Sequence, residues 1–179
     1  MPIISTRQSF NGFDQKIIRL KLTPLIAEVE FSLTRFQLLV KEEKHANGTQ
    51  GLRKAIDEGF SEAGGWSKLS SGGVDWTKTN RDGRAVGVEV QVSGRSDMLA
   101  VDVLHLSEQL REGSVDVCVI VVPDDDLSKF LTDRTPNFST ALRHVQRAKD
   151  LPIQIIAFRH DGTGPALPKI KTNLGKDTA

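Results

Sequence analysis

Apolar residues recur at helical spacing in two stretches of the first third of the chain. One helix is predicted from Thr23-Pro24, where proline suits the first helical turn, to about Asn47-Gly48. Its apolar face consists of Leu25, Val29, Leu33, Phe36 and Val40. A second helix is predicted from about Gln50 to Ala63, ahead of the glycine pair 64–65. Its apolar face consists of Leu52, Ile56 and Phe60, and it also carries Glu58.

After Gly73 the pattern changes from helical to alternating. Alternation over Val74–Lys78 and again over Ala85–Val92 predicts two β-strands. The segment between them contains Asn80-Arg81-Asp82-Gly83, and Asp-Gly tolerates the positive φ angles of a tight turn. The two strands are therefore expected to pair as a hairpin.

Strands and helices alternate through the rest of the chain. The predicted order is helix Met98–Glu112, strand Val115–Val122, helix Ser139–Lys149 and strand Ile153–Phe158. Such an alternation is typical of an α/β fold. We expect a single domain over residues 1–179, with a loosely ordered tail from about residue 163.

Composition narrows the function only slightly. The chain has 179 residues, of which 38% are hydrophobic and 26% charged, as is ordinary for a globular domain. Its net charge of +1 lacks the basic excess of many nucleic-acid-binding proteins, so DNA binding would depend on local placement of charge. No stretch resembles a membrane helix or a signal peptide, so we expect a cytoplasmic protein without a membrane partner. Cys118, the single cysteine, lies in an apolar run that does not suit a catalytic thiol.

Candidate chemistry lies on the predicted hairpin. In Val88-Glu89-Val90-Gln91-Val92, alternation places Glu89 and Gln91 on one face, about 7 Å apart. Asp75 on the partner strand can approach the same face. Two neighbouring carboxylates repel unless they share a proton or a cation, and oxygen ligands favour Mg²⁺ or Mn²⁺. Periodicity alone equally describes a half-exposed strand with a solvated polar face, in which Asp75 is only an edge residue.

The order of these residues favours the first interpretation. The order resembles the core of the PD-(D/E)XK nucleases. In that core a helix with a glutamate is followed by an acidic residue, a turn and an acid-x-polar triplet, here Glu58, Asp75 and Glu89-Val90-Gln91. That resemblance implies a mixed central β-sheet flanked by helices, the restriction-endonuclease-like fold. It also implies that both acids bind a divalent metal beside a third residue, commonly lysine. Gln91 departs from that pattern and removes a positive charge from the site.

A narrower resemblance is to the BglII- and BamHI-like type II restriction endonucleases, in which E-V-Q is followed by serine, as in Glu89 to Ser93 here. It implies Asp75, Glu89 and the Val90 carbonyl as ligands of Mg²⁺, with Mn²⁺ as a substitute, and Gln91 as the residue that positions water. Glu58 is a weaker catalytic candidate, because an exposed helix glutamate is usually only a solvated charge. Homodimers that cut double-stranded DNA at a short palindrome, with GATC at its centre, are implied as well.

Two polar loops are candidates for reading DNA. The residues proposed for contacts with bases or backbone are Ser93, Arg95, Ser96, Arg134, Asn137 and Ser139. Asn137 or Ser139 can instead cap the following helix. Lys78 in the hairpin is a candidate phosphate contact, and a merely solvated lysine is as good an interpretation.

Three functions are compatible with the sequence. The leading one is a type II restriction endonuclease that hydrolyses phosphodiester bonds at a specific site. The second is a PD-(D/E)XK nuclease of low specificity in repair or mobile elements. The third is a catalytically inactive DNA-binding module, which the absence of a site lysine keeps open.

Overall fold

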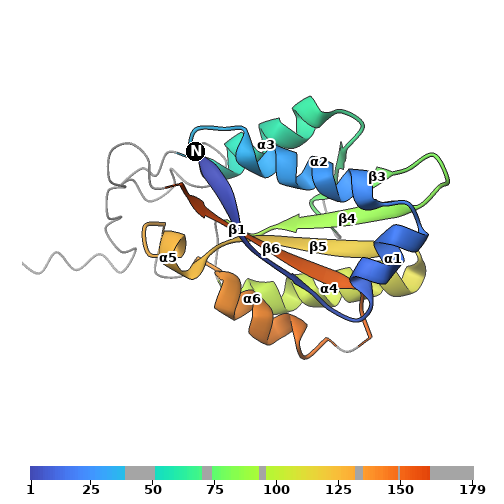
Figure 1. Cartoon of the computed structure of the whole chain (residues 1–179). Coiled ribbons are helices and arrows are strands. Elements are labelled where there is room, and N and C mark those ends of the chain that lie inside the picture. Colours follow the sequence, from blue (N-terminus) through green and yellow to red (C-terminus); the bar gives the residue numbers. More distant parts are fainter. Residues whose placement is uncertain (39–50, 70–73, 93–95, 132–134, 149, 162–179) are drawn as a thin grey trace, which may run out of the picture.

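A six-stranded sheet with strand order β1-β6-β5-β4-β3-β2 forms the centre of the computed structural model (Figure 1). The structure describes residues 1–38, 51–69, 74–92, 96–131, 135–148 and 150–161. The strands are β1 (Pro2–Ser9), β2 (Ser67–Lys68), β3 (Trp76–Thr79), β4 (Ala85–Val90), β5 (Val117–Pro123) and β6 (Ile153–His160). The helices are α1 (Phe13–Arg19), α2 (Thr23–Thr34), α3 (Leu52–Ala63), α4 (Met98–Glu112), α5 (Asp125–Ser128) and α6 (Phe138–Val145).

The sheet is mixed. β4, β5 and β6 run parallel to one another, whereas β3 and β1 pair antiparallel with β4 and β6. Helices cover both faces, with α1, α2 and α3 on one side and α4 and α6 on the other (Figure 1). The predicted α/β fold with a mixed central sheet is therefore confirmed.

Alternation along β4 and β5 divides the core into two layers. Val86, Val88 and Val90 of β4 pack with α2 and α3, so Glu89 is directed toward the layer of α4. In β5 the odd-numbered valines from 117 to 121 face α2 and α3, while Cys118, Ile120 and Val122 face the other layer. β5 is buried on both faces, as its continuous apolar run predicted.

The predicted hairpin forms, with Trp76 opposite Val88 and Thr79 opposite Ala85. At its tip, Asn80 accepts hydrogen bonds from the backbone of Asp82 and Arg84, and Gly83 has a φ of 76°. The tip is also tied to the region after α1. Its bonds are Asn80 to the Leu20 carbonyl (2.9 Å) and Lys21 to Asp82 (2.9 Å).

Several predicted boundaries were wrong. The first helix ends at Thr34 instead of continuing toward residue 47, and residues 35–38 are not helical. The Thr34 hydroxyl donates to the carbonyls of Glu30 and Phe31, and Phe36 packs against the core from the segment that follows the helix. The strand predicted over 85–92 ends at Val90, and the helix predicted from Ser139 covers Phe138–Val145. β1 was not predicted. The proposed tail, residues 163–179, lies outside the described residues.

In the described part of the chain, no helix has both the length and the apolar character that a membrane span requires.

Candidate active site

Asp75 lies immediately before β3, and both of its carboxylate oxygens are engaged. Oδ2 accepts a 2.8 Å hydrogen bond from the backbone N–H of Val90, which fixes the carboxylate against the end of β4. Oδ1 accepts a 2.6 Å bond from Nη2 of Arg53. The antiparallel register of Trp76 with Val88 brings Asp75 to this end of the hairpin, as the sequence predicted.

Glu89 and Gln91 lie on one face, as their alternation predicted. Nε2 of Gln91 donates a 2.9 Å hydrogen bond to Oε1 of Glu89 and a 2.6 Å bond to Oδ2 of Asp102 on α4. Glu89 is only 7% exposed. The site therefore contains a third carboxylate, Asp102, which the sequence reasoning missed.

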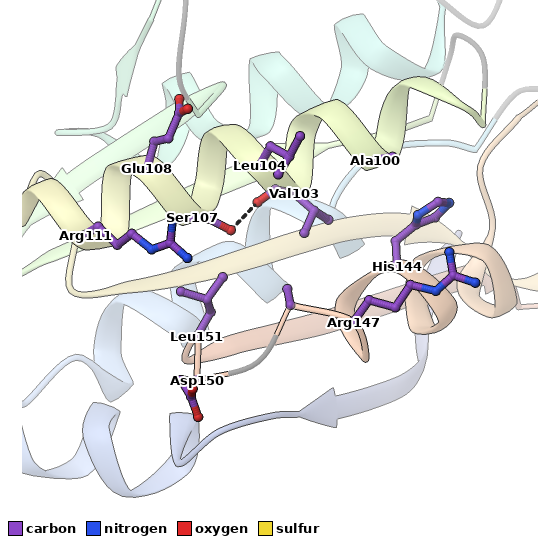
Figure 2. Close-up of a pocket in the computed structure, with 11 residues that line it drawn as sticks. Ala100, Val103, Leu104, Ser107, Glu108, Arg111, His144, Arg147, Asp150 and Leu151 are labelled. Atoms are coloured by element: carbon purple, nitrogen blue, oxygen red, sulfur yellow. Dashed lines mark hydrogen bonds between the residues drawn. The ribbon is translucent and has the colours of Figure 1, made fainter.

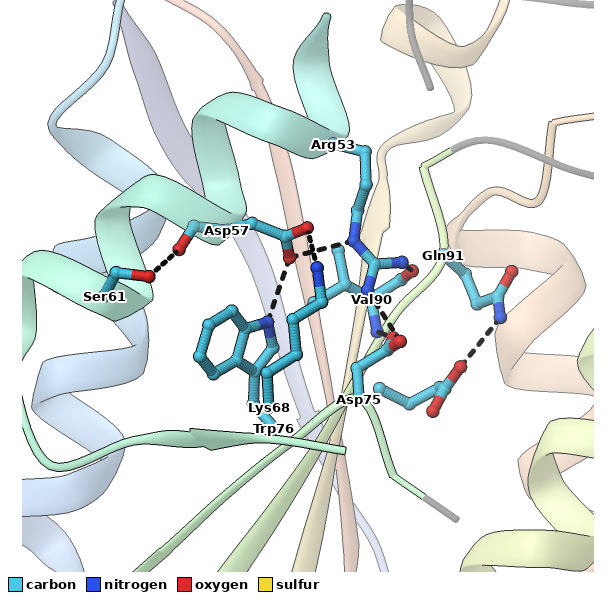
Figure 3. A network of polar contacts seen from close by, with 9 residues as sticks. Arg53, Asp57, Ser61, Lys68, Asp75, Trp76, Val90 and Gln91 are labelled. Atoms are coloured by element: carbon cyan, nitrogen blue, oxygen red, sulfur yellow. Dashed lines mark hydrogen bonds and ion pairs between the residues drawn. The ribbon is translucent and has the colours of Figure 1, made fainter. Parts of the chain in front are cut away.

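Arg53 enters the site from α3, on the opposite face of the sheet (Figure 3). Besides its bond to Asp75, its Nη1 donates a 2.9 Å hydrogen bond to the carbonyl of Val90, and its Nε donates a 3.0 Å bond to Asp57. Asp57 also accepts from Lys68 (2.5 Å) and from the indole N–H of Trp76 (3.0 Å). A continuous polar network thus joins α3 to both strands of the hairpin.

Burial and like charge shift the ionisation of the acids. Burial, followed by the charges of Asp75 and Asp102, raises the pKa of Glu89 to about 8. Burial and Asp75 raise the pKa of Asp102 to about 6. At neutral pH Glu89 therefore retains a proton in the absence of a further cation.

In the network of Arg53 the pKa shifts favour the charged forms instead. Burial alone would lower the pKa of the Arg53 guanidinium, but the carboxylates of Asp75 and Asp57 outweigh it and raise that pKa. Burial would likewise raise the pKa of Asp57, but Lys68, Arg53 and Trp76 outweigh it and lower the pKa. Arg53 and Asp57 thus remain charged near pH 7.

The oxygen atoms gathered here are of the kind that a hard divalent cation prefers. The carboxylates of Asp75 and Glu89 and the carbonyl of Val90 are hard oxygen ligands, and the buried Glu89 gains its charge readily only beside a cation. Among the residues that the structure describes, no three His, Cys, Asp or Glu side chains are arranged as a ready metal cage. Arg53 is bonded to two of the three candidate ligands, Asp75 and Val90.

Glu58 and Lys78 lie apart from this cluster. Glu58 is 61% exposed and pairs with Lys54 at 3.5 Å, so it is not directed at Asp75 or Glu89. Lys78 is only 18% exposed and donates to Glu28 (2.6 Å) and to the carbonyl of Gly64 (2.7 Å). A phosphate contact by Lys78 would require these bonds to break.

The loop candidates are only partly described. Ser96 is half-buried just before α4, and Ser93, Arg95 and Arg134 lie outside the described residues. Asn137 caps α6, where its Oδ1 accepts from the Thr140 N–H at 3.0 Å. Ser139 is bonded through its hydroxyl and its backbone N–H to Asp125. Asn137 therefore has the capping role that the sequence left open.

A hollow between α4 and α6 lies away from the acids (Figure 2). Its lining includes Leu104, Arg111, His144 and Arg147. Burial and the neighbouring charges of Arg143 and Arg147 lower the pKa of His144. None of the residues that line this hollow is among those proposed for catalysis.

Only weak sequence signals pointed to the network residues that the sequence reasoning missed, Arg53, Asp57 and Asp102. Arg53 and Asp57 form an i,i+4 pair, which is usually a surface feature of a helix. Asp102 interrupts the apolar stripe of α4 between Leu99 and Val103. Neither pattern indicates which strand end the side chain reaches.

Comparison with models of protein families places the chain in a known family. The family model described as "BamHI: Restriction endonuclease BamHI" matches residues 3–178, nearly the whole chain. A search among curated proteins found no match.

Proposed function

This chain belongs to the BamHI restriction endonuclease family, a family of site-specific endodeoxyribonucleases, and from that premise we propose that it uses Mg²⁺ to cut both strands of DNA at a short palindrome. The observation that carries the proposal is the convergence of Asp75, Glu89 and Gln91 at one end of the β3–β4 hairpin. An acid pair beside a backbone carbonyl is a suitable ligand set for a hard divalent cation that faces a phosphodiester.

Each residue of this cluster has a proposed role. Asp75, Glu89 and the Val90 carbonyl hold Mg²⁺, and Mn²⁺ can substitute. When bound, the cation polarises the phosphate and lowers the pKa of an attacking water. The described hydrogen bonds of the Gln91 side chain both use Nε2, so Oε1 is available to accept from that water and orient it. Glu58 is the weakest catalytic candidate, because its exposed side chain pairs with Lys54.

Recognition of DNA is proposed for two loops, one that precedes α4 and one that precedes α6. Arg95 and Arg134, with Ser93, Ser96 and Ser139, are the proposed contacts, and a site centred on GATC remains part of the proposal. Asn137 and Lys78 are weaker candidates, since one caps α6 and the other bonds Glu28. The enzyme would act in the cytoplasm, where DNA is its partner.

A homodimer is proposed because the two strands of a palindrome are related by twofold symmetry. Exposed apolar side chains recur every third residue on the outer face of α4. They are Met98 (48% exposed), Val101 (38%) and Leu104 (62%). We propose this α4 stripe as the surface that a second copy of the chain covers.

Plasmid cleavage tests the proposal. With Mg²⁺ the protein should convert plasmid into discrete fragments, and Glu89→Ala should abolish cleavage while Glu62→Ala, an exposed glutamate on α3, leaves it unchanged. Smeared products or nicks would instead support a nuclease of low specificity. Binding of DNA without cleavage over a range of metals and pH values would support the inactive module, which Gln91 in place of lysine keeps open.

A further inference from the structure

We propose that Arg53 is the internal counter-ion of the metal-free site, which holds Asp75 and the Val90 carbonyl until a divalent cation displaces it. The inference rests on the proposed metal site and adds a positioning residue to it. Arg53 donates to Oδ1 of Asp75 at 2.6 Å and to the Val90 carbonyl at 2.9 Å. These are two of the three oxygens proposed to bind Mg²⁺.

The competition concerns the contacts that Asp75 already makes. Asp75 has two carboxylate oxygens, and Val90 N–H occupies Oδ2 while Arg53 occupies Oδ1. The N–H of Val90 belongs to the backbone of β4, in the interior of the sheet, and does not move freely. Arg53 is a long side chain on a helix. Arg53 is therefore the group that yields its place when a cation binds Asp75.

Asp57 keeps the displaced guanidinium nearby. It accepts from Nε of Arg53 at 3.0 Å, and it is itself fixed by Lys68 and by the indole of Trp76. A small shift of the whole guanidinium can break the contacts with Asp75 and Val90 while the side chain stays within reach of Asp57. The guanidinium donates but accepts no hydrogen bonds, so it contributes no ligand to the metal.

A simple charge effect must be separated from this direct competition. Any positive charge near the site weakens cation binding, whatever its contacts. Arg53→Lys retains the charge but loses the planar fork that spans two oxygens. Lys68→Gln removes a charge from the same network without touching Asp75 or Val90. Arg53→Met removes both the charge and the contacts.

The test measures Mn²⁺ binding to the full-length protein by electron paramagnetic resonance at pH 8, without DNA. Relative to wild type, Arg53→Lys and Arg53→Met should bind Mn²⁺ about tenfold more tightly, whereas Lys68→Gln should change the affinity no more than about twofold. Thermal melting confirms that each variant is folded. If Arg53→Met does not fold, Arg53→Lys decides.

Three results would overturn the inference. If Arg53→Lys binds Mn²⁺ no more tightly than wild type, the effect of Arg53 is only that of a nearby charge. If wild type binds Mn²⁺, Glu89→Ala does not, and neither Arg53 variant is tighter, this inference fails while the metal site stands. Absence of Mn²⁺ binding by every folded protein would overturn both.

Discussion

Asp102 of α4 accepts a 2.6 Å hydrogen bond from the side-chain nitrogen of Gln91, just beyond β4. The same nitrogen donates to Glu89, so two acids fix the orientation of one amide. A helix on one face of the sheet thereby determines the direction of the Gln91 carbonyl oxygen, the atom proposed to orient water.

Substitution of Asp102 should impair catalysis more than DNA binding. In Asp102→Ala the Gln91 amide loses one of its two acceptors, and the cleavage rate should fall about tenfold or more, as is usual for residues that orient a ligand shell. Asp102→Asn retains an acceptor oxygen, so its cleavage rate should fall less. Single-turnover cleavage and DNA binding in Ca²⁺ measure the two effects, with Glu108→Ala on the exposed face of α4 as the control. Equal rates for wild type and Asp102→Ala would refute a positioning role.

The metal-free protein should lose stability as pH rises toward 8. Folded Glu89 holds its proton up to a pKa of about 8, compared with an ordinary value of 4.5, so between these values the folded state binds more protons than the unfolded state. Glu89→Gln removes this pH dependence. At pH 8 its free energy of unfolding should exceed that of wild type by about 2 kcal/mol or more.

Urea unfolding at pH 5, 6.5 and 8, with chelator present, measures that slope. Excess Mg²⁺ should flatten the wild-type curve, because a bound cation favours the ionised carboxylate. If the free energy of unfolding changes with pH in the same way for wild type and Glu89→Gln, Glu89 does not have a raised pKa.

Gly59→Ala should strongly destabilise the protein. A Cβ at position 59 would lie 2.6 Å from the backbone oxygen of Ser32, so α3 would have to move away from α2. The expected loss is about 2 kcal/mol or more in unfolding free energy. Because α3 carries Arg53, cleavage should fall as well. Ser61→Ala, on the exposed side of the same helix, should change stability by less than about 0.5 kcal/mol in urea unfolding.

The hairpin part of the site could be predicted because its information is local. Alternation sets the common face of Glu89 and Gln91, and the Asp-Gly turn brings Asp75 back beside them. Arg53 and Asp102 come from helices on opposite faces of the sheet. Helix periodicity shows which face of a helix is buried but not which strand end a polar side chain reaches. The positions of Arg53 and Asp102 in the site could therefore not be predicted from the sequence.

The same limit applies to the fold. β1 became part of the sheet through antiparallel pairing with β6, more than 140 residues away in sequence, and no local pattern marks that partnership. The predicted first helix was too long because Phe36 continued the apolar spacing after the helix had ended. Apolar spacing records burial, which a following loop can provide as well as another helical turn.

Leu104→Glu should convert the proposed dimer to monomer. Leu104 is 62% exposed, the most exposed of the three residues of the proposed contact surface on α4, where a buried charge without a partner is unfavourable. Analytical ultracentrifugation over a range of concentrations measures the change, and Glu112→Lys at the end of α4 is the charge-altering control. A monomeric wild type, or an unchanged dimer in Leu104→Glu, would exclude this surface.

The β3–β4 ribbon extends away from the acids and is tied at its far end, through Asn80 and Asp82, to the segment that follows α1. Adding one residue to each strand would lengthen the ribbon by about 3.3 Å at that far end and leave Asp75 beside Val90. The number of residues between the two acids is therefore a measure of the reach of the ribbon and carries no chemical information. A search pattern that fixes this interval would overlook enzymes whose acids meet in the same way.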